Sequence, residues 1–400
     1  MNIFKRFFIN SLIVFFSIII TLFILNLSLI YLIKQKNFLF EKFDTNRMSS
    51  LQISLFPDIY NNFENEYTLL VGDSYTFGNG DSRLNGEYNY SIPHHMFSNN
   101  RNLNFFNAGR SGSDSFSAVK YVYYLYNLID QSIFLKNSIK EPNKIIFFFY
   151  EGNDIMFNAR SRYKKMNNCS FFNKKLNTTD KFFESNFYVL KFFYYNLRHQ
   201  LNLNVQKGNL VSLLKIILSE KNYTKLENKY GTPDKINNYS NIILFNSNIS
   251  KSVDFPQFPP FEITSDLLDQ SYKILDLSLN CLNSKFPNVE KYFVYIPSPA
   301  VLYNFADDKI LVQSDISDHK FFYKSVLEFK KESLMYEKII SKIAQKNSLK
   351  IISIRNKLLR YSKNELIHGI KDFHHFNSLG YKLTAEILLE EIWMKYLQVY

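Results

Sequence analysis

Short runs of apolar residues alternate along the chain with longer amphipathic stretches, and this pattern predicts strands alternating with helices. The runs at Thr68–Val71, 102–107 and Lys144–Tyr150 are short and apolar, as in buried strands. Further strands are expected at 292–296 and 349–354, where the alternation is more regular. Strands separated by helices at this spacing favour a parallel sheet covered by helices on both faces, an α/β fold with three layers, α/β/α.

The predicted helices occupy the stretches between these strands. Apolar residues recur at helical spacing in 263–283, and a long amphipathic pattern covers 319–347. Helices are also expected at 116–138 and, after the loop 371–380, at 381–397. These helices complete the two outer layers of the predicted fold.

The first 66 residues predict a membrane anchor and a linker. Residues 7–33 hold 27 residues without a charge, which as a helix would be about 40 Å long, enough to cross a bilayer. The run is too long for a signal-peptide core, and no small-residue cleavage site follows it. We therefore expect an uncleaved single-pass anchor at 1–36 and a polar juxtamembrane linker at 37–66. Lysine and arginine flank both sides of the segment, so charge barely decides its orientation.

The globular part is expected at 67–400. Between about 155 and 262 the pattern weakens, and residues rich in Asn, Lys and aromatic side chains predict an inserted or covering segment. The Pro-rich piece at 255–260 is expected to close it. We find no internal repeat in this part of the sequence.

Composition narrows the choice of partners. The formal net charge of +12 favours anionic surfaces, but the lysines are spread along the chain and no nucleic-acid-binding motif is present. Cys169 and Cys281 lack the spacing of a metal site and could form one disulfide, which the sequence alone leaves open. No cluster of acidic, His or Cys residues suggests a metal or another cofactor.

Glycines mark the loops where chemistry is expected. The chain has only 11 glycines, and six of them follow apparent strands: Gly72, Gly78, Gly109, Gly112, Gly152 and Gly380. Parallel strands bring their carboxyl-end loops to one edge of a sheet, so we expect these loops to converge.

Ser74 is the candidate nucleophile at this edge. It follows the first strand in the turn Gly72-Asp73-Ser74, which equally could be a plain strand-to-helix turn. Ester cleavage by a serine needs a histidine base, a carboxylate that orients it and N–H donors for the oxyanion. The other predicted loops supply these parts: Gly112, Asn153, Asp372 and His375.

These sequence blocks resemble the SGNH (GDSL-type) hydrolase family. Gly72-Asp73-Ser74 resembles its first block, 107–112 (NAGRSG) the second, and Gly152-Asn153-Asp154 the third. The stretch 372–381 (DFHHFNSLGY) resembles the last block, Asp-x-x-His followed by x-Asn-x-x-Gly. The blocks occur in family order and span most of the predicted soluble part.

The resemblance implies a flavodoxin-like fold and a role for each matched residue. Ser74 is the implied nucleophile, His375 the base and Asp372 the acid. The amides of Ser74 and Gly112 and the side chain of Asn153 form the implied oxyanion hole.

Several of these assignments have alternatives. His374 is adjacent to His375 and could take the part of the base. Asn153 could merely cap a helix, Asp73 is expected to form the turn, and Arg110 could meet an anionic or sugar substrate or be a surface charge. His94, His95, His199, His319 and His368 have no motif context.

The implied activity is acyl transfer without a cofactor. We expect a membrane-anchored esterase that removes an acyl group, most simply acetyl, from a cell-envelope glycan or lipid on the extracytoplasmic side. The alternative is an O-acyltransferase that modifies an exported polysaccharide with the same triad, favoured weakly by the segment Pro297-Ser298-Pro299. A third reading is a catalytically idle binding module. Protein partners are not predicted.

Overall fold

The structure is a computed structural model that describes residues 9–14, 16–17, 20–22, 24, 66–84, 90–131, 140–163, 166, 168–169, 241–246, 249–259, 263–315, 320–370 and 372–393. The chain divides into two units. One comprises residues 1–58, 127–137 and 175–231 and lies almost entirely outside the described residues. The other comprises 59–126, 138–174 and 232–400 and contains every candidate site residue.

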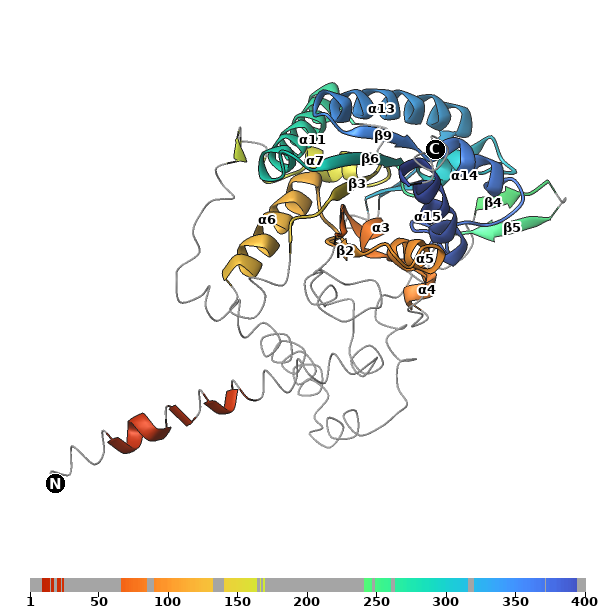
Figure 1. Ribbon diagram of the computed structural model, residues 1–400. Coiled ribbons are helices and arrows are strands. Elements are labelled where there is room, and N and C mark those ends of the chain that lie inside the picture. Colours follow the sequence, from red (N-terminus) through yellow and green to blue (C-terminus); the bar gives the residue numbers. More distant parts are fainter. Residues whose placement is uncertain are drawn as a thin grey trace, which may run out of the picture. The chain divides into compact units, whose positions relative to one another are not determined.

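A five-stranded parallel sheet forms the core of this second unit, in the order β2-β1-β3-β6-β9 (Figure 1). Its strands are β1 (Thr68–Val71), β2 (Phe105–Asn107), β3 (Lys144–Tyr150), β6 (Glu290–Ile296) and β9 (Lys350–Ser353). The predicted α/β fold with a central parallel sheet is confirmed. The chain leaves β1 for β2 on one side and reaches β3 on the other, so the switch point lies at the carboxyl ends of β1 and β3.

The central strand β3 is buried on both faces, which explains its continuous apolar sequence. Ile146 and Phe148 belong to one hydrophobic core cluster. The alternate side chain Phe147 faces the other layer and stacks on Phe293 of β6, with ring centroids 5.9 Å apart. Burial on both faces therefore requires helices on both sides of the sheet.

Helices cover both faces (Figure 1). One layer contains α5 (Ile92–Asn99), α14 (Arg355–Ser362) and α15 (Ser378–Ile392), whose side chains join the core cluster of the sheet. The other contains α6 (Ser115–Gln131), α7 (Asp154–Ala159), α11 (Ser265–Lys285) and α13 (Val326–Lys346). The short helices α3 (Ser74–Phe77), α4 (Asp81–Leu84) and α12 (Pro299–Leu302) lie in the connections.

Two antiparallel hairpins differ from the sequence predictions. β4 (Asn241–Leu244) pairs with β5 (Ser250–Val253) within the predicted insertion, and β7 (Lys309–Asp315) pairs with β8 (Lys320–Ser325). The helix predicted over 319–347 is therefore wrong in its first part and begins at Val326. The aromatic run in β8 pairs across the hairpin, with Phe322 opposite Val312, so its backbone bonds go to another strand.

The predicted membrane-spanning segment, residues 7–33, is described only at 9–14, 16–17, 20–22 and 24. Among the described residues, no helix is both long and apolar enough to span a bilayer. Residues 37–65 of the predicted linker and the middle of the insertion, residues 170–240, lie outside the described residues. The predictions for these segments stay predictions.

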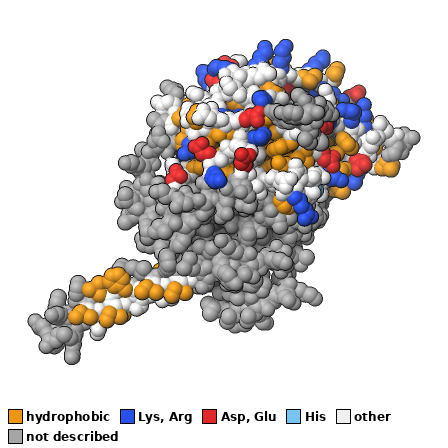
Figure 2. All heavy atoms as spheres, in the orientation of Figure 1, with side chains coloured by type: hydrophobic (Ala, Val, Ile, Leu, Met, Phe, Trp, Pro, Cys, Tyr) orange, Lys and Arg blue, Asp and Glu red, His pale blue; other side chains and the backbone are white. Residues whose placement is uncertain are grey.

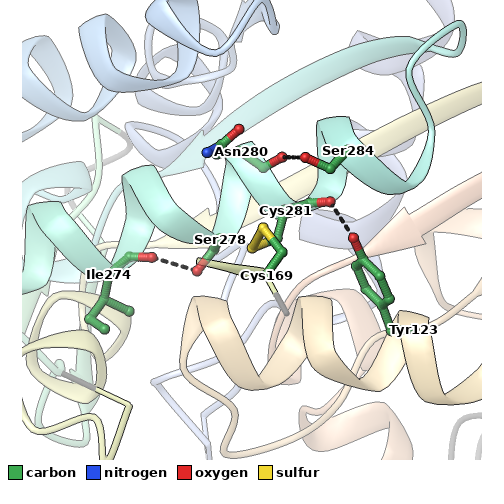
Figure 3. Close-up of a disulfide and its surroundings, with 7 residues drawn as sticks. All are labelled: Tyr123, Cys169, Ile274, Ser278, Asn280, Cys281 and Ser284. Atoms are coloured by element: carbon green, nitrogen blue, oxygen red, sulfur yellow. Dashed lines mark hydrogen bonds between the residues drawn. A yellow bond between two sulfur atoms is a disulfide. The ribbon is translucent and has the colours of Figure 1, made fainter. Parts of the chain in front are cut away.

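Cys169 and Cys281 form a disulfide, which settles the alternative that the sequence leaves open (Figure 3). Cys281 is buried on α11, and its carbonyl accepts a 2.8 Å hydrogen bond from the hydroxyl of Tyr123 on α6. The disulfide therefore fixes residue 169, beyond α7, to the helical layer that covers one face of the sheet.

Basic and acidic side chains are interspersed on the face shown in Figure 2. Several lysines are paired, such as Lys357 with Glu390 at 2.6 Å and Lys346 with Asp276 at 2.7 Å. This mixture is what the spread of lysines along the sequence predicts.

Candidate active site

Ser74 lies at the carboxyl end of β1, where the chain turns into α3. Asp73 is the N-cap of this helix, and its Oδ1 accepts a 3.0 Å hydrogen bond from the Tyr75 N–H. The expectation that Asp73 forms the turn is thereby confirmed. Gly72 packs so closely on β3 that a Cβ would lie 2.8 Å from the carbonyl oxygen of Phe148. The turn thus needs glycine, and it places the buried Ser74 hydroxyl at the switch point.

A chain of hydrogen bonds joins Ser74, His375 and Asp372. Ser74 Oγ lies 2.9 Å from His375 Nε2, although 301 positions separate the two residues. On the other side of the ring, Nδ1 lies 2.8 and 2.9 Å from the two carboxylate oxygens of Asp372. Because an ionised carboxylate only accepts, Nδ1 carries a proton, and Nε2 of the neutral ring can accept the Ser74 proton.

The loop that carries His375 is held by Asn377. Its Oδ1 caps α15 by accepting the Gly380 N–H at 3.0 Å, and its Nδ2 donates to two carbonyls of the segment 366–368. A Cβ at Gly380 would lie 2.1 Å from a carbonyl oxygen of that segment. The Gly369 N–H donates to the His375 carbonyl at 3.0 Å. The Asn-x-x-Gly spacing therefore serves to fix the base loop.

His374 and His375 have different surroundings, although they are adjacent. The Tyr75 hydroxyl donates to the backbone carbonyl of His374. The centroid of the Tyr75 ring lies 5.3 Å from the centroid of the His375 ring. The Nδ1 of His374 is buried and makes no hydrogen bond to any described residue. The geometry therefore brings His375, and not His374, to Ser74 and Asp372.

The pKa values of the ionisable groups near His375 are shifted in directions that burial and neighbouring charges explain. Burial opposes the ionisation of Asp372, but the charge and hydrogen bond of His375, with the charge of His374, lower its pKa to about 2. Burial lowers the pKa of His374 below its ordinary value, and lowers that of the fully buried His368 to about 3. Burial therefore favours the uncharged form of both of these neighbours.

The second block is fixed against the nucleophile helix. Asn107 Nδ2 donates to the Thr76 carbonyl at 2.8 Å, and its Oδ1 accepts the Gly109 N–H at 2.9 Å. A Cβ at Gly109 would lie 2.4 Å from the backbone nitrogen of Phe77. Gly112 is exposed, with φ of +70° and no atom within 4 Å of its Cβ position. Its backbone therefore borders open space at the end of a fixed loop.

The sequence leaves the role of Arg110 in this loop open, and the structure shows its contacts. Its N–H donates to the Gly72 carbonyl at 3.0 Å, and its guanidinium lies over the ring of Tyr121, 5.5 Å from the centroid. The backbone of Arg110 thus joins the second block to the first, and its side chain is partly engaged by α6.

Asn153 follows β3 on the other side of the switch point. It occupies the N-cap position of α7, yet its side chain makes no capping hydrogen bond. The residue is 5% exposed, and its side chain lies close enough to Asp73 to lower the pKa of that carboxyl group. Asn153 therefore precedes the first turn of α7, but its side chain does not serve as the cap of that helix. Its neighbour Asp154 accepts the Tyr150 N–H at 2.9 Å.

Sequence reasoning missed a buried carboxylate beside this block. Glu151 is fully buried and accepts hydrogen bonds from the Ser298 N–H at 2.8 Å, from Ser333 Oγ at 2.6 Å and from the Tyr295 hydroxyl. Ser298 in turn caps α12 through the Ala300 N–H. The segment Pro297-Ser298-Pro299 thus anchors β3 and α12. Only tertiary contacts identify Glu151, because its partners lie far away in sequence.

A cavity of about 460 Å³ is lined in part by residues 368–370 and Asn377, next to the loop that carries His375. Its lining includes Asp81, Lys251 and His368, but not Ser74, Asp372 or His375. The cavity is therefore separate from the hydrogen-bonded chain.

The arrangement is a Ser–His–Asp chain at the carboxyl edge of a parallel sheet, the geometry with which hydrolases transfer acyl groups. No family model and no curated protein matches the chain. Solved structures do match, at low similarity, and none of these likenesses bears on the chemistry of this chain.

Three of the matching structures are the following. A member of the lipolytic protein G-D-S-L family from Veillonella parvula has 12% identity and a TM-score of 0.33, over 83% of this chain and 100% of the other. An acetyl xylan esterase, AlAXEase, has 14% identity and a TM-score of 0.33, over 82% and 99%. A possible lipase from Chitinophaga pinensis has 8% identity and a TM-score of 0.35, over 84% and 100%.

Proposed function

We propose that this chain is a serine esterase of the SGNH type. The observation that carries the proposal is the hydrogen-bonded chain from Ser74 Oγ through His375 to Asp372, at 2.9 and 2.8 Å. In the proposed reaction His375 takes the Ser74 proton as Ser74 attacks an ester carbonyl, and Asp372 stabilises the imidazolium. Water then releases the acyl group, with His375 as the base again.

The proposed oxyanion hole consists of the Ser74 and Gly112 amides and the Asn153 side chain. Two features support it: the backbone of Gly112 borders open space, and the side chain of Asn153 does not cap its helix. Loss of one such donor typically lowers turnover by about a hundredfold or more. We propose an acyl, most simply acetyl, ester of a cell-envelope glycan or lipid as the substrate, on the strength of the sequence resemblance.

The test is turnover of p-nitrophenyl acetate by the purified full chain, with Ser74→Ala as the matched variant. We expect the wild type to release p-nitrophenol and to be labelled by a fluorophosphonate, and Ser74→Ala to lose both, with turnover lower by about a thousandfold or more. Absence of turnover and of labelling in the folded wild type would refute the proposal. The products distinguish the two reactions when a polysaccharide is added. Hydrolysis releases the free acid, whereas the transferase reaction yields acylated polysaccharide.

We further propose that residues 7–33 anchor the chain in a membrane, with the catalytic unit on the extracytoplasmic side. The uncharged sequence supports the anchor, and the Cys169–Cys281 disulfide supports an oxidising compartment. A pair of reporters fused after Tyr400, one active only outside the cytoplasm and one only inside, tests the orientation. Activity of the cytoplasmic reporter alone contradicts it.

A further inference from the structure

Asp73 accepts more hydrogen bonds than a helix cap requires. Its Oδ1 accepts the Tyr75 N–H at 3.0 Å, and its Oδ2 lies 3.1 Å from Ser74 Oγ. The side chain of Asn153 lies close enough to lower the pKa of this carboxyl group. Asp73 is 1% exposed, so these neighbours replace the water around its carboxyl group. Asp73 thus connects the candidate nucleophile after β1 with the candidate oxyanion donor after β3.

The hydroxyl of Ser74 has one proton and two acceptors within reach. Asp73 Oδ2 lies 3.1 Å from Ser74 Oγ, and His375 Nε2 lies 2.9 Å from it. When His375 is neutral, Ser74 donates to Nε2. When His375 is protonated, Nε2 donates to Ser74 Oγ and Ser74 donates to Asp73, so every group in the chain has a partner. In the free enzyme, Asp73 therefore stabilises protonated His375 through two successive hydrogen bonds that meet at the serine oxygen.

We propose that Asp73 is a positioning residue that holds the Ser74 hydroxyl and the Asn153 side chain in one arrangement and stabilises protonated His375 across the serine oxygen. This inference rests on the proposed function. In the step concerned, the Ser74 O–H proton moves to His375 Nε2, a bond forms between Oγ and the ester carbon, and the carbonyl electron pair moves to its oxygen. Asp73 exchanges no proton in this step. Because Oγ has then given up its proton, Asp73 acts on protonated His375 at this stage through its negative charge and not through a hydrogen bond from Ser74.

The buried neighbour Asp154 explains how Asp73 keeps its charge. Burial and the charge of Asp73 raise the pKa of Asp154 well above its ordinary value, so Asp154 holds the proton of the pair. Burial raises the pKa of Asp73 above its ordinary value, and the hydrogen bonds from Tyr75 and Ser74, the charge of His375 and the nearby Asn153 side chain offset only part of that rise. The two donors that Asp73 accepts from, the Tyr75 N–H and the Ser74 hydroxyl, favour its ionised form.

Other ionisable groups around His375 enter the same balance. Those that face or neighbour it are Asp372 and His374 on its own loop, Tyr75 and Asp73 at the nucleophile turn, and His368 on the paired segment. Burial keeps His374 and His368 uncharged near neutral pH, and burial raises the pKa of Tyr75. Among these groups, Asp372 and Asp73 are therefore the two that bring negative charge close to His375.

The test is the pH profile of kcat/KM for Asp73→Asn, which keeps an oxygen acceptor for the Tyr75 N–H. We expect the acid limb of the profile to move to lower pH by about one unit, the effect of a charge roughly 6 Å from the base in a partly screened site. We also expect kcat to fall about tenfold with little change in KM, because the charge beside Ser74 and Asn153 is lost. Asp276→Asn, which removes the same charge far from the triad, should leave the profile unchanged.

The outcomes separate this inference from the proposed function. If wild type neither turns over substrate nor is labelled at Ser74, the proposed function fails. If wild type is active and Asp73→Asn has an unchanged acid limb, the inference fails and the function stands. Asp73→Ser, which keeps a short cap, replaces Asp73→Asn if that variant does not fold. If neither folds, Asp73 serves the fold of the turn alone and the inference is overturned.

Discussion

At the scale of single residues, the adjacent histidines of the base loop show what position in the sequence can and cannot decide. His375 has the Asp-x-x-His spacing, but one residue of difference in the loop would favour His374 instead. The structure places the His375 ring between Ser74 and Asp372, whereas the His374 Nδ1 is buried without a hydrogen bond among the described residues. The two side chains should therefore differ sharply when each is replaced.

We expect His375→Gln to lower kcat/KM for p-nitrophenyl acetate by about a thousandfold or more, because the Ser74 proton loses its acceptor. His374→Gln should lower it by less than about tenfold, since the backbone carbonyl that Tyr75 contacts is retained. Steady-state kinetics of the two variants, with thermal unfolding of each, checks this. Equal losses, or a larger loss in His374→Gln, would assign the base to His374.

At the scale of elements, the glycines of the second block have two different roles. Gly109 lies where α3 and the loop touch, and a Cβ there would be 2.4 Å from the Phe77 nitrogen. Gly112 needs glycine only for its φ of +70°, because nothing lies within 4 Å of its Cβ position. One position is restricted by a neighbouring element and the other by its own backbone.

Gly109→Ala should therefore be more harmful than Gly112→Ala. Because backbone atoms must move, we expect Gly109→Ala to cost about 1–3 kcal/mol or more in the free energy of unfolding and to lower turnover by shifting the loop. Gly112→Ala should cost about 1 kcal/mol, the strain of a left-handed alanine, and it keeps the backbone N–H. Urea unfolding and esterase kinetics of both variants test the comparison. A stable, fully active Gly109→Ala would refute the close contact.

The elements also show where apolar patterns mislead. The strand Lys144–Tyr150 is evident in the sequence because burial on both faces makes it apolar throughout. The sequence predicts a helix that starts at the residues of β8, because their aromatic run follows no pattern that separates a hairpin strand from a helix. Its partner β7 supplies the missing information, with Phe322 opposite Val312. Such pairing is a property of two segments and not of one.

At the scale of the whole molecule, strand order and one covalent bond determine what meets. The turn from β1 and the loop from β3 follow neighbouring strands, so Asn153 becomes a neighbour of Asp73. Outside the sheet, the Cys169–Cys281 disulfide fixes the chain beyond α7 to α11 across a sequence separation of 112. Neither contact involves the base loop.

We therefore expect loss of the disulfide to change stability more than activity. The double variant Cys169→Ala/Cys281→Ala should lower the free energy of unfolding by about 2–5 kcal/mol, because the unfolded chain gains the freedom of an open loop. Its esterase turnover at 25 °C should stay within a few-fold of wild type. Urea unfolding, with thiol alkylation before and after reduction, measures both bond and stability. Two free thiols in the unreduced protein would contradict the pairing.

The sequence by itself determined the parallel α/β core, the post-strand loops and the order of the blocks that carry Ser74, Asn153, Asp372 and His375. It could do so because buried strands are apolar throughout and because tight turns at a sheet edge need glycine and short polar side chains. The tertiary structure alone decided between His374 and His375 and showed that the two cysteines pair. It also showed that the Asn153 side chain makes no capping hydrogen bond to α7, and it brought Asn153 close to Asp73. These are distances between segments far apart in the chain, and spacing along one segment does not encode them.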